Sequence, residues 1–96
     1  MKLINSDIFE DTISGSSIVQ FSATWCGPCK VLTSVIEKNE NNLNSTFYKI
    51  DIDASQDIAA KYNIRSVPTL IRFESGKEVD RLIGNASLSK LTKFAS

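Results

Sequence analysis

Two cysteines three residues apart, placed where an apolar segment gives way to a helical pattern, constrain this chain more than any other feature. Residues 17–22 form a mostly apolar run of the kind found in a buried strand. Residues 31–38 carry their apolar side chains at helical spacing. Cys26 and Cys29 lie between these segments and are the only cysteines in the chain. The pattern predicts a strand followed by a helix, with Cys26 at or just before the first helical turn.

The start of a helix favours the ionised form of a cysteine. The first backbone N–H groups have no partners within the helix, and the helix dipole attracts negative charge to them. The thiolate is the nucleophile of thiol chemistry, so Cys26 is our candidate nucleophile. Pro28 suits the first turn because it has no N–H group to leave unpaired. Gly27 leaves room above Cys26 for an incoming disulfide.

Cys29 is placed to complete such a reaction. It is expected on the same helix face as Cys26, with about 5–6 Å between the two Cβ atoms. A disulfide needs roughly 3.5–4.5 Å between those atoms, so the pair can close with a small local adjustment. Cys26 would attack a substrate disulfide, Cys29 would resolve the mixed disulfide, and the protein would leave oxidised.

Two other uses of the cysteine pair find less support in the sequence. A zinc site needs about four ligands, usually Cys or His. This chain has two cysteines and no histidine, so a closed zinc site would require a partner chain. A purely structural disulfide at this spacing closes almost no loop and stabilises little. We therefore predict redox chemistry and no metal site.

Length, composition and charge exclude several other classes of protein. The 96 residues make one small domain, and a hydrophobic content of 42% excludes a disordered chain. Eleven basic and eleven acidic residues cancel, so neither a nucleic-acid nor a membrane partner is indicated. No apolar run approaches the roughly 20 residues of a membrane span, and residues 1–7 lack an apolar signal core. A lone Cys-x-x-Cys pair then suits a reducing compartment, so we expect a cytoplasmic protein.

Strand and helix signals alternate along the chain in the order β-α-β-α-β-α-β-β-α. Strands are expected at about 2–5, 17–22, 46–53, 68–73 and 78–83. Helices are expected from a cap at Ser6 or Asp7 to Ser14, over 26–39, from a cap at Ser55 or Asp53 to a left-handed Asn63, and after a cap at Ser87. Their inward faces are predicted to carry Ile8, Phe9 and Ile13; Leu32 and Ile36 with Val31 and Val35; Ile58, Ala59 and Tyr62; and Leu88, Leu91 and Ala95. This order predicts an α/β fold, a mixed sheet with helices on both faces.

Two segments of this chain resemble the thioredoxin family. The segment Trp25-Cys26-Gly27-Pro28-Cys29-Lys30 resembles the active-site motif of the thioredoxins, and residues 61–70 resemble the family's segment around its cis-proline. The resemblance runs from about Leu3 to about Phe94. It implies a single thioredoxin domain over 1–96, with a mixed central sheet of about five strands flanked by about four helices.

The resemblance also implies roles for residues outside the cysteine pair. It implies a cis Val67–Pro68 bond, where the sequence alone would favour trans, and a Val67 backbone that pairs with an extended substrate. It implies that Trp25 is a flat wall beside the sulfur atoms and not a core aromatic. The family's substrate groove maps onto Trp25, Gly27, Pro28, Ile52, Val67, Pro68, Gly84 and, less directly, Asn85. A plain linker remains the alternative for Gly84.

Gln20 is the main departure from the family pattern. Most thioredoxins have an aspartate here, buried behind the resolving cysteine and generally taken as the base that helps that cysteine lose its proton. An amide does not titrate in the working range, so Gln20 can only form hydrogen bonds, with a water molecule as one conceivable partner. Lys49 matches the lysine that usually neighbours the aspartate. It is expected either to turn to solvent or to favour a thiolate by its charge.

The implied function is protein dithiol–disulfide oxidoreductase, an electron carrier that reduces substrate disulfides. The resemblance implies no bound cofactor beyond the redox-active Cys26–Cys29 disulfide, which a flavin-containing thioredoxin reductase would recharge with NADPH. The expected partners are this reductase and disulfide-containing client proteins, and we expect a monomer.

Two alternatives to this function are open to test. The chain could be a redox-independent binding subunit of a larger assembly; a Cys26→Ser, Cys29→Ser chain that keeps the biological activity would identify that role. A glutathione-linked glutaredoxin is disfavoured, because that class usually has tyrosine where this motif has Trp25 and Pro28.

Overall fold

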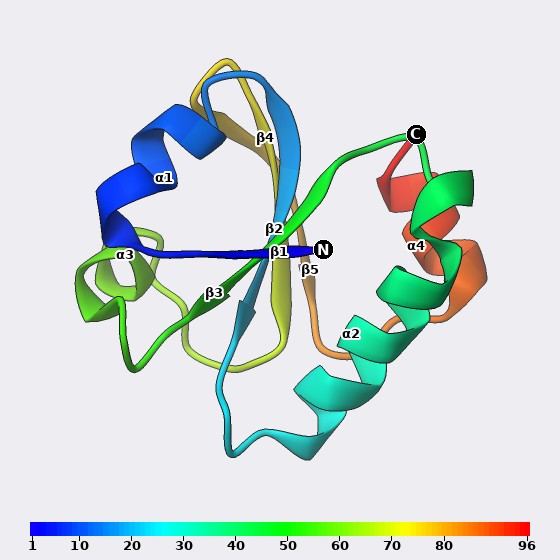
Figure 1. The fold of residues 1–96 in the computed structure, drawn as a ribbon, viewed down its shortest axis with the longest axis horizontal. Helices are drawn as coiled ribbons and strands as arrows, with labels where there is room; N and C mark the ends of the chain where they lie inside the picture. Colours follow the sequence, from blue (N-terminus) through cyan, green and yellow to red (C-terminus); the bar gives the residue numbers. More distant parts are fainter.

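The computed structural model describes residues 1–96 as a five-stranded mixed sheet with helices on both faces (Figure 1). The strands are β1 (Lys2–Ile4), β2 (Ser16–Ser22), β3 (Phe47–Asp51), β4 (Thr69–Glu74) and β5 (Lys77–Ile83). The helices are α1 (Ser6–Thr12), α2 (Gly27–Asn39), α3 (Gln56–Lys61) and α4 (Leu88–Phe94), with a 3-10 segment, η1, at Glu40–Asn42. The element order and the fold class predicted from the sequence are confirmed.

The sheet has the strand order β1-β3-β2-β4-β5, which places β2 at its centre. The pairs β1–β3 and β2–β3 are parallel, whereas β2–β4 and β4–β5 are antiparallel. Parallel neighbours need crossover helices, and α1 and α2 supply them. The central position explains the apolar run of β2, in which six of the seven residues are buried. No helix is long and apolar enough to span a bilayer.

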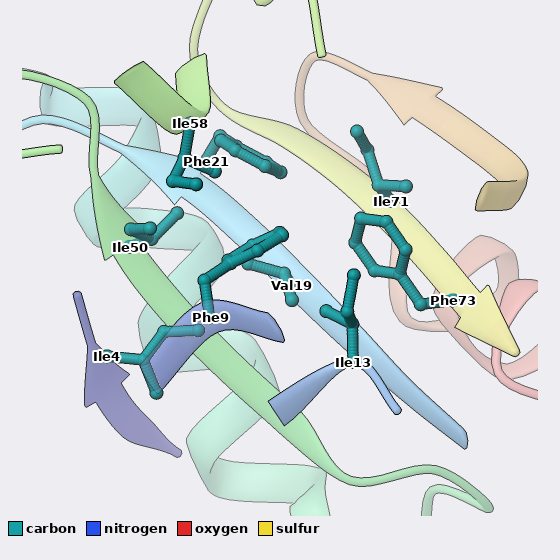
Figure 2. Close-up of a cluster of buried hydrophobic side chains, with 9 residues drawn as sticks. All are labelled: Ile4, Phe9, Ile13, Val19, Phe21, Ile50, Ile58, Ile71 and Phe73. Carbon is teal, nitrogen blue, oxygen red and sulfur yellow. The ribbon is translucent and has the colours of Figure 1, made fainter. Parts of the chain in front are cut away.

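An aromatic cluster, here called the first core, fills the space between the sheet and helices α1 and α3 (Figure 2). Its buried members are Ile4, Phe9, Ile13, Val19, Phe21, Ile50, Ile58, Ile71 and Phe73. Phe9 and Phe73 meet edge to face with 5.7 Å between ring centroids, a favourable geometry for aromatic pairs. Tyr62 packs at the margin of this cluster, where burial raises the pKa of its phenol above the ordinary value.

A second core lies on the opposite face of the sheet, under α2 and α4. Its buried members are Ile18, Leu32, Ile36, Leu43, Phe47, Leu70, Leu91, Phe94 and Ala95. Leu32 and Ile36 hold α2 against β2 and β3, which fixes the direction of the helix that carries the cysteines. The inward face predicted for this helix is therefore confirmed at those two positions.

Three predicted inward residues are exposed instead, namely Ile8, Val31 and Leu88. Val31, with 60% of its surface exposed, lies beside the stripe of Cys29, Leu32 and Ile36, which already covers the sheet. In the last helix Leu91 and Phe94 are the buried residues. Apolar spacing identified the right helices but overestimated the width of their buried faces.

Helix caps and turns were predicted with mixed success. The N-cap of α1 is Asn5, whose side-chain oxygen accepts the N–H of Asp7, and not Ser6 or Asp7. Ser55 occupies the N-cap position of α3 without a capping hydrogen bond, whereas the Ser87 hydroxyl accepts the N–H of Lys90 as predicted. The predicted left-handed conformation of Asn63 is confirmed at φ 55°.

Candidate active site

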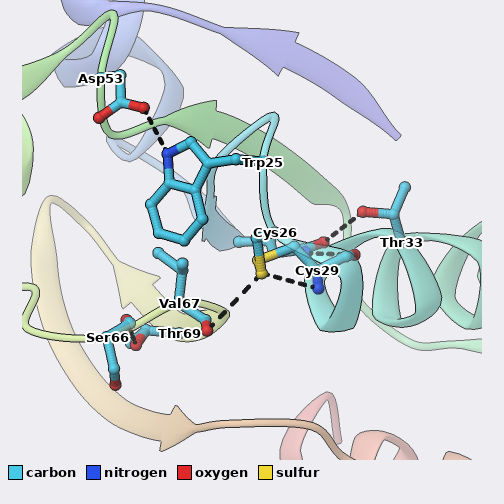
Figure 3. The surroundings of a disulfide bond; sticks show 9 residues. Trp25, Cys26, Cys29, Thr33, Asp53, Ser66, Val67 and Thr69 are labelled. Carbon is cyan, nitrogen blue, oxygen red and sulfur yellow. Dashed lines mark hydrogen bonds between the residues drawn. A yellow bond between two sulfur atoms is a disulfide. The ribbon is translucent and has the colours of Figure 1, made fainter.

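The two cysteines form a disulfide at the N-terminus of α2 (Figure 3). Cys26 is the N-cap residue, with an extended backbone, and Cys29 lies one turn inside the helix. Their Cα atoms are 5.3 Å apart, within the range that disulfides require. Both residues are nearly enclosed, with Cys26 5% exposed and Cys29 1% exposed. Cys26 is therefore the more exposed of the two cysteines.

The helix start directs a hydrogen bond at the outer sulfur. The backbone N–H of Cys29 donates to Cys26 Sγ over 3.1 Å, which makes the side chain of Cys26 the cap of its own helix. Pro28 occupies the first turn, where its missing N–H leaves no group unpaired. A Cβ atom added at Gly27 would meet nothing within 4 Å, so the space beside Gly27 is open. A thiolate on Cys26 would be stabilised by this N–H group and by the helix dipole.

The loop before β4 faces the disulfide from the other side. The Val67–Pro68 peptide bond is cis, as the resemblance implied. The carbonyl oxygen of Val67 lies 3.8 Å from Cys26 Sγ, although 41 residues separate them in the sequence. Neither the N–H nor the C=O of Val67 takes part in a backbone hydrogen bond. The loop therefore presents a peptide group without a backbone partner, whose carbonyl oxygen faces Cys26 Sγ.

Gly84 comes next to this loop from the end of β5. Its N–H donates to the carbonyl of Pro68 over 2.9 Å, and its φ of +87° lies in the region that favours glycine. The structure thus places Gly84 at the site and gives it a reason to be glycine beyond a linker. Asn85 follows it and is exposed.

Apolar side chains complete the surroundings of the disulfide. Ile52 and Val67 are partly buried and pack against the cluster of Ala23, Cys26 and Cys29. Trp25 is 67% exposed, so it is not a core aromatic. Its indole N–H donates to the carboxylate of Asp53 over 2.9 Å, which holds the ring in place (Figure 3). The place of Asp53 at the site was not predicted, because no local pattern in the sequence links it to Trp25.

Gln20 lies behind the inner cysteine and is completely buried. Its amide nitrogen donates to the carbonyl of Cys29 over 3.1 Å, and its amide oxygen accepts the hydroxyl of Thr33 over 3.1 Å. Both ends of the amide are bonded to the protein itself. Thr33 was missed by sequence analysis; its one signal is its position four residues after Cys29, on the same side of α2.

Lys49 is the register partner of Gln20 on the neighbouring strand β3. Its half-buried side chain makes no ion pair and lines a cavity of about 470 Å³ beside α2. Thr33, Lys30 and Asp51 contribute to the same wall. The cavity reaches Thr33, and through it Gln20, but not the sulfur atoms. No group of three or more Asp, Glu, Cys or His side chains is arranged to hold a metal ion.

Known proteins resemble this chain over its whole length. The thioredoxin family model matches residues 1–96. A thioredoxin of Chlamydia muridarum is 44% identical over 98 aligned positions, which cover all of this chain and 96% of the relative. Thioredoxin-2 of Saccharomyces cerevisiae is 48% identical over 68 positions, which cover 70% of this chain and 65% of the relative. The crystal structure of a Malassezia sympodialis thioredoxin superposes with a TM-score of 0.87 at 34% identity, covering 99% of this chain and 87% of that one.

Proposed function

Because the chain belongs to the thioredoxin family and is a protein dithiol–disulfide oxidoreductase, we propose that Cys26 attacks client disulfides and that Cys29 resolves the product. The observation that carries this assignment is the hydrogen bond from the Cys29 N–H to Cys26 Sγ at the start of α2. It favours ionisation of the outer sulfur, and Cys29 lies deeper and behind it. Cys26 at the N-cap is therefore expected to be the more reactive cysteine, and Cys29, one turn further into α2, the less reactive one.

The reaction proceeds through two exchanges of sulfur atoms. In the reduced protein the Cys26 thiolate attacks one sulfur of a client disulfide, and the other client sulfur leaves as a thiolate that takes up a proton. Cys29 then loses its proton and attacks Cys26 Sγ, which releases the second client thiolate. Two electrons pass from the dithiol to the client, and the protein is left with the disulfide seen in the structure.

The groove around Cys26 fits an extended segment of a protein client. The unpaired N–H and C=O groups of Val67 can pair with such a segment as an added strand. Trp25, Ile52 and Pro68 supply apolar contacts on either side, and the open space at Gly27 admits the client sulfur. Gly84 holds the Pro68 carbonyl, so that the cis-proline loop keeps its place beside the groove.

The environment of Cys29 affects the second exchange. The Gln20 amide, which binds the Cys29 carbonyl from behind, neither takes up nor releases a proton. Its register partner on β3 is Lys49, which carries a positive charge. The proton of Cys29 must therefore leave without a buried carboxylate. We propose that the resolving step is slow near neutral pH for that reason.

Regeneration completes the proposed cycle. A thioredoxin reductase that draws on NADPH would return the disulfide to the dithiol, with no cofactor bound to this chain. We propose that the protein is a monomer that works in the cytoplasm. Reducing conditions there allow thiol–disulfide exchange between client disulfides and the Cys26–Cys29 pair.

The assay that tests this function is the reduction of insulin, followed by the turbidity of the precipitating chains. Dithiothreitol as the reductant tests the chemistry, and NADPH with a bacterial thioredoxin reductase tests the partner. We expect acceleration in both arms, none with the Cys26→Ser variant, and no reduction of the disulfide by glutathione. An unaltered insulin rate in the dithiothreitol arm would refute the function, and failure of the second arm alone would refute only the partner.

A further inference from the structure

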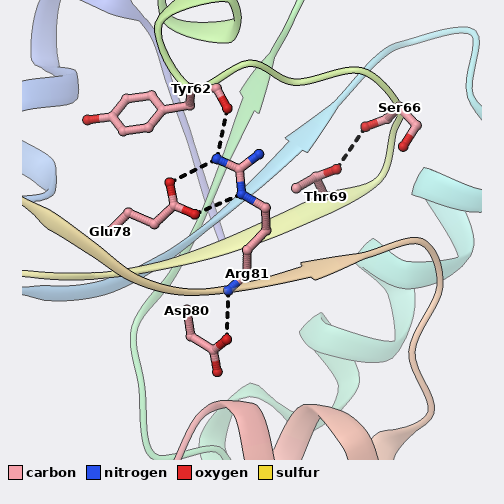
Figure 4. A network of polar contacts seen from close by, with 6 residues as sticks. All are labelled: Tyr62, Ser66, Thr69, Glu78, Asp80 and Arg81. Carbon is pink, nitrogen blue, oxygen red and sulfur yellow. Dashed lines mark hydrogen bonds and ion pairs between the residues drawn. The ribbon is translucent and has the colours of Figure 1, made fainter.

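An arginine and a glutamate on β5 form a two-pronged ion pair away from the disulfide (Figure 4). Arg81 Nε donates to one carboxylate oxygen of Glu78 over 2.7 Å, and Nη2 donates to the other over 2.8 Å. The same Nη2 also donates to the backbone carbonyl of Tyr62 over 2.8 Å. The side chains are only 27% and 31% exposed, so the pair is partly shielded from water. Its geometry is the strong, paired form of an arginine–carboxylate contact.

A bulge in β5 is what brings these two side chains together. Residues three apart in a regular strand point to opposite faces. Here Phe73 pairs with Glu78 and Arg72 pairs with Asp80, so that Val79 has no partner on β4. The extra residue puts Glu78 and Arg81 on one face, over the first core. The bulge therefore builds the contact to Tyr62.

The carbonyl of Tyr62 marks the start of the loop that faces the disulfide. Tyr62 is the C-cap residue of α3, and the chain turns at the left-handed Asn63 directly after it. A cation at the end of a helix binds a carbonyl that has no partner within the helix. Arg81 thus ties the first residue of the segment 62–68 to the hairpin of β4 and β5.

The other end of the loop is tied to the same hairpin. The Thr69 hydroxyl donates to the carbonyl of Ser66 over 2.8 Å, and the Gly84 N–H donates to the carbonyl of Pro68. All three tethers come from β4, β5 or the residue that follows β5. Between the tethers the peptide groups of Val67 stay unpaired, at the place where a client segment would bind.

We propose that Glu78 and Arg81 are positioning residues for client binding, which hold the cis-proline loop in the place where Val67 can pair with a protein substrate. This inference rests on the proposed function of the groove. A preorganised loop spares the complex the entropy of ordering residues 63–67, so loss of the pair weakens the binding of extended clients. A small disulfide that does not pair with Val67 needs no such preorganisation, and its reaction with Cys26 is independent of the pair.

The test compares two arginines that both bind backbone carbonyls. Arg72, 24% exposed, donates to the carbonyls of Phe94 and Ser96 at the C-terminal end of α4 and has no contact with the loop. KM and kcat for insulin are measured for Arg81→Met, Arg81→Lys and the control Arg72→Met. The rate constant with 5,5′-dithiobis(2-nitrobenzoate) reports Cys26 alone.

Arg81→Met removes the three hydrogen bonds that Arg81 donates to Glu78 and Tyr62. It is expected to raise KM for insulin about fivefold, which is less than these bonds are worth, because the client loses only the ordering of the loop and no contact of its own. Arg81→Lys is expected to recover only part of the affinity, because an ammonium group cannot bind Glu78 and Tyr62 as a fork. Arg72→Met is expected to leave KM unchanged, and the small disulfide is expected to react equally with all chains. Glu78→Gln, which keeps the shape of the side chain, is expected to raise KM in the same direction by a smaller factor.

The outcomes separate this inference from the function on which it rests. An unchanged KM in both Arg81→Met and Glu78→Gln overturns the inference while the function stands. The same holds if Arg72→Met raises KM as much as Arg81→Met, since the effect is then general loosening, or if the small disulfide slows in parallel. If the unaltered chain does not reduce insulin, the proposed function fails and the inference fails with it.

Discussion

The two faces of strand β2 differ although they come from the same seven residues. Val19 and Phe21 point into the first core, whose buried members are all apolar. On the opposite face Ile18 belongs to the second core, but Gln20 binds the backbone of Cys29 and the hydroxyl of Thr33. One face is thus apolar except at the buried Ser17, at the end of the strand away from the disulfide. The other face becomes polar as the strand approaches the disulfide.

This difference separates stability from chemistry within one strand. The first core contains three buried aromatic rings, and Tyr62 packs at its margin. Each of these four rings lies within 6.4 Å of another, so this face buries much apolar surface. On the face toward α2, Gln20 makes hydrogen bonds behind Cys29 where an apolar side chain would make only packing contacts. A change on the first face should alter folding alone, and a change near the disulfide should alter reactivity, which the following predictions test.

The largest effect is expected at the disulfide itself. Cys26→Ser replaces the attacking thiolate by a hydroxyl, which is a far weaker nucleophile, and should lower insulin reduction by about a thousandfold or more. Cys29→Ser should retain the attack and accumulate the mixed disulfide, visible as a mass adduct of the client. Under reducing conditions both variants should unfold in urea within about 1 kcal/mol of the unaltered chain. A Cys26→Ser chain that still reduced insulin would contradict the assignment.

On the apolar face, truncation should affect only folding. Phe21→Ala empties space in the first core and should lower the free energy of unfolding by about 3–5 kcal/mol. Urea denaturation measures the loss, and Phe21→Leu serves as the milder control. The alkylation rate of reduced Cys26, measured in the absence of urea, should remain unchanged while the chain is folded. A parallel fall in that rate would show that the two faces are coupled.

Gln20 tests the polar face directly. Gln20→Asp introduces a carboxyl group whose pKa burial raises, and above that pKa it can accept the proton of Cys29. We expect release of the mixed disulfide to speed up about tenfold as pH rises through that pKa, measured by stopped flow. The control is Gln20→Asn, which has the same length without the titrating group and should show no such rise. Equal rates for Gln20→Asp and the unaltered chain at every pH would refute the role of Gln20.

The smallest effect is expected at Glu78, outside both faces of β2. Hydrogen bonds from Arg81 lower the pKa of Glu78 below its ordinary value of 4.5. A carboxyl whose pKa is lowered by folding adds stability above its unfolded pKa, and this contribution is lost as pH falls through the folded pKa. Glu78→Gln should therefore destabilise the chain by less than about 1 kcal/mol at neutral pH, since the pair is partly exposed. The difference in melting temperature should shrink below pH 4.5 and vanish in stronger acid; a constant difference would contradict this account.

The fold and the centre of the site were predictable from the sequence for a local reason. Apolar periods identify strands and helices, and Pro28 beside a cysteine pair identifies the start of α2. Three predictions of burial were wrong, at Ile8, Val31 and Leu88. The spacing of apolar residues shows which side of a helix faces the sheet, but not how many residues on that side the sheet covers. The Asn5 cap was missed because Ser6 and Asp7 are equally good capping residues.

What the sequence by itself determined is the placement of a reactive sulfur at the opening of a helix, since neighbouring residues make that geometry. The tertiary structure alone decided what lies opposite it. Val67 comes within 3.8 Å of Cys26 from 41 residues away, Gln20 finds Thr33, and a bulge at Val79 turns Arg81 toward Tyr62. Such contacts depend on the pairing register of strands and on the packing of α2 and α3, which no short stretch of sequence contains.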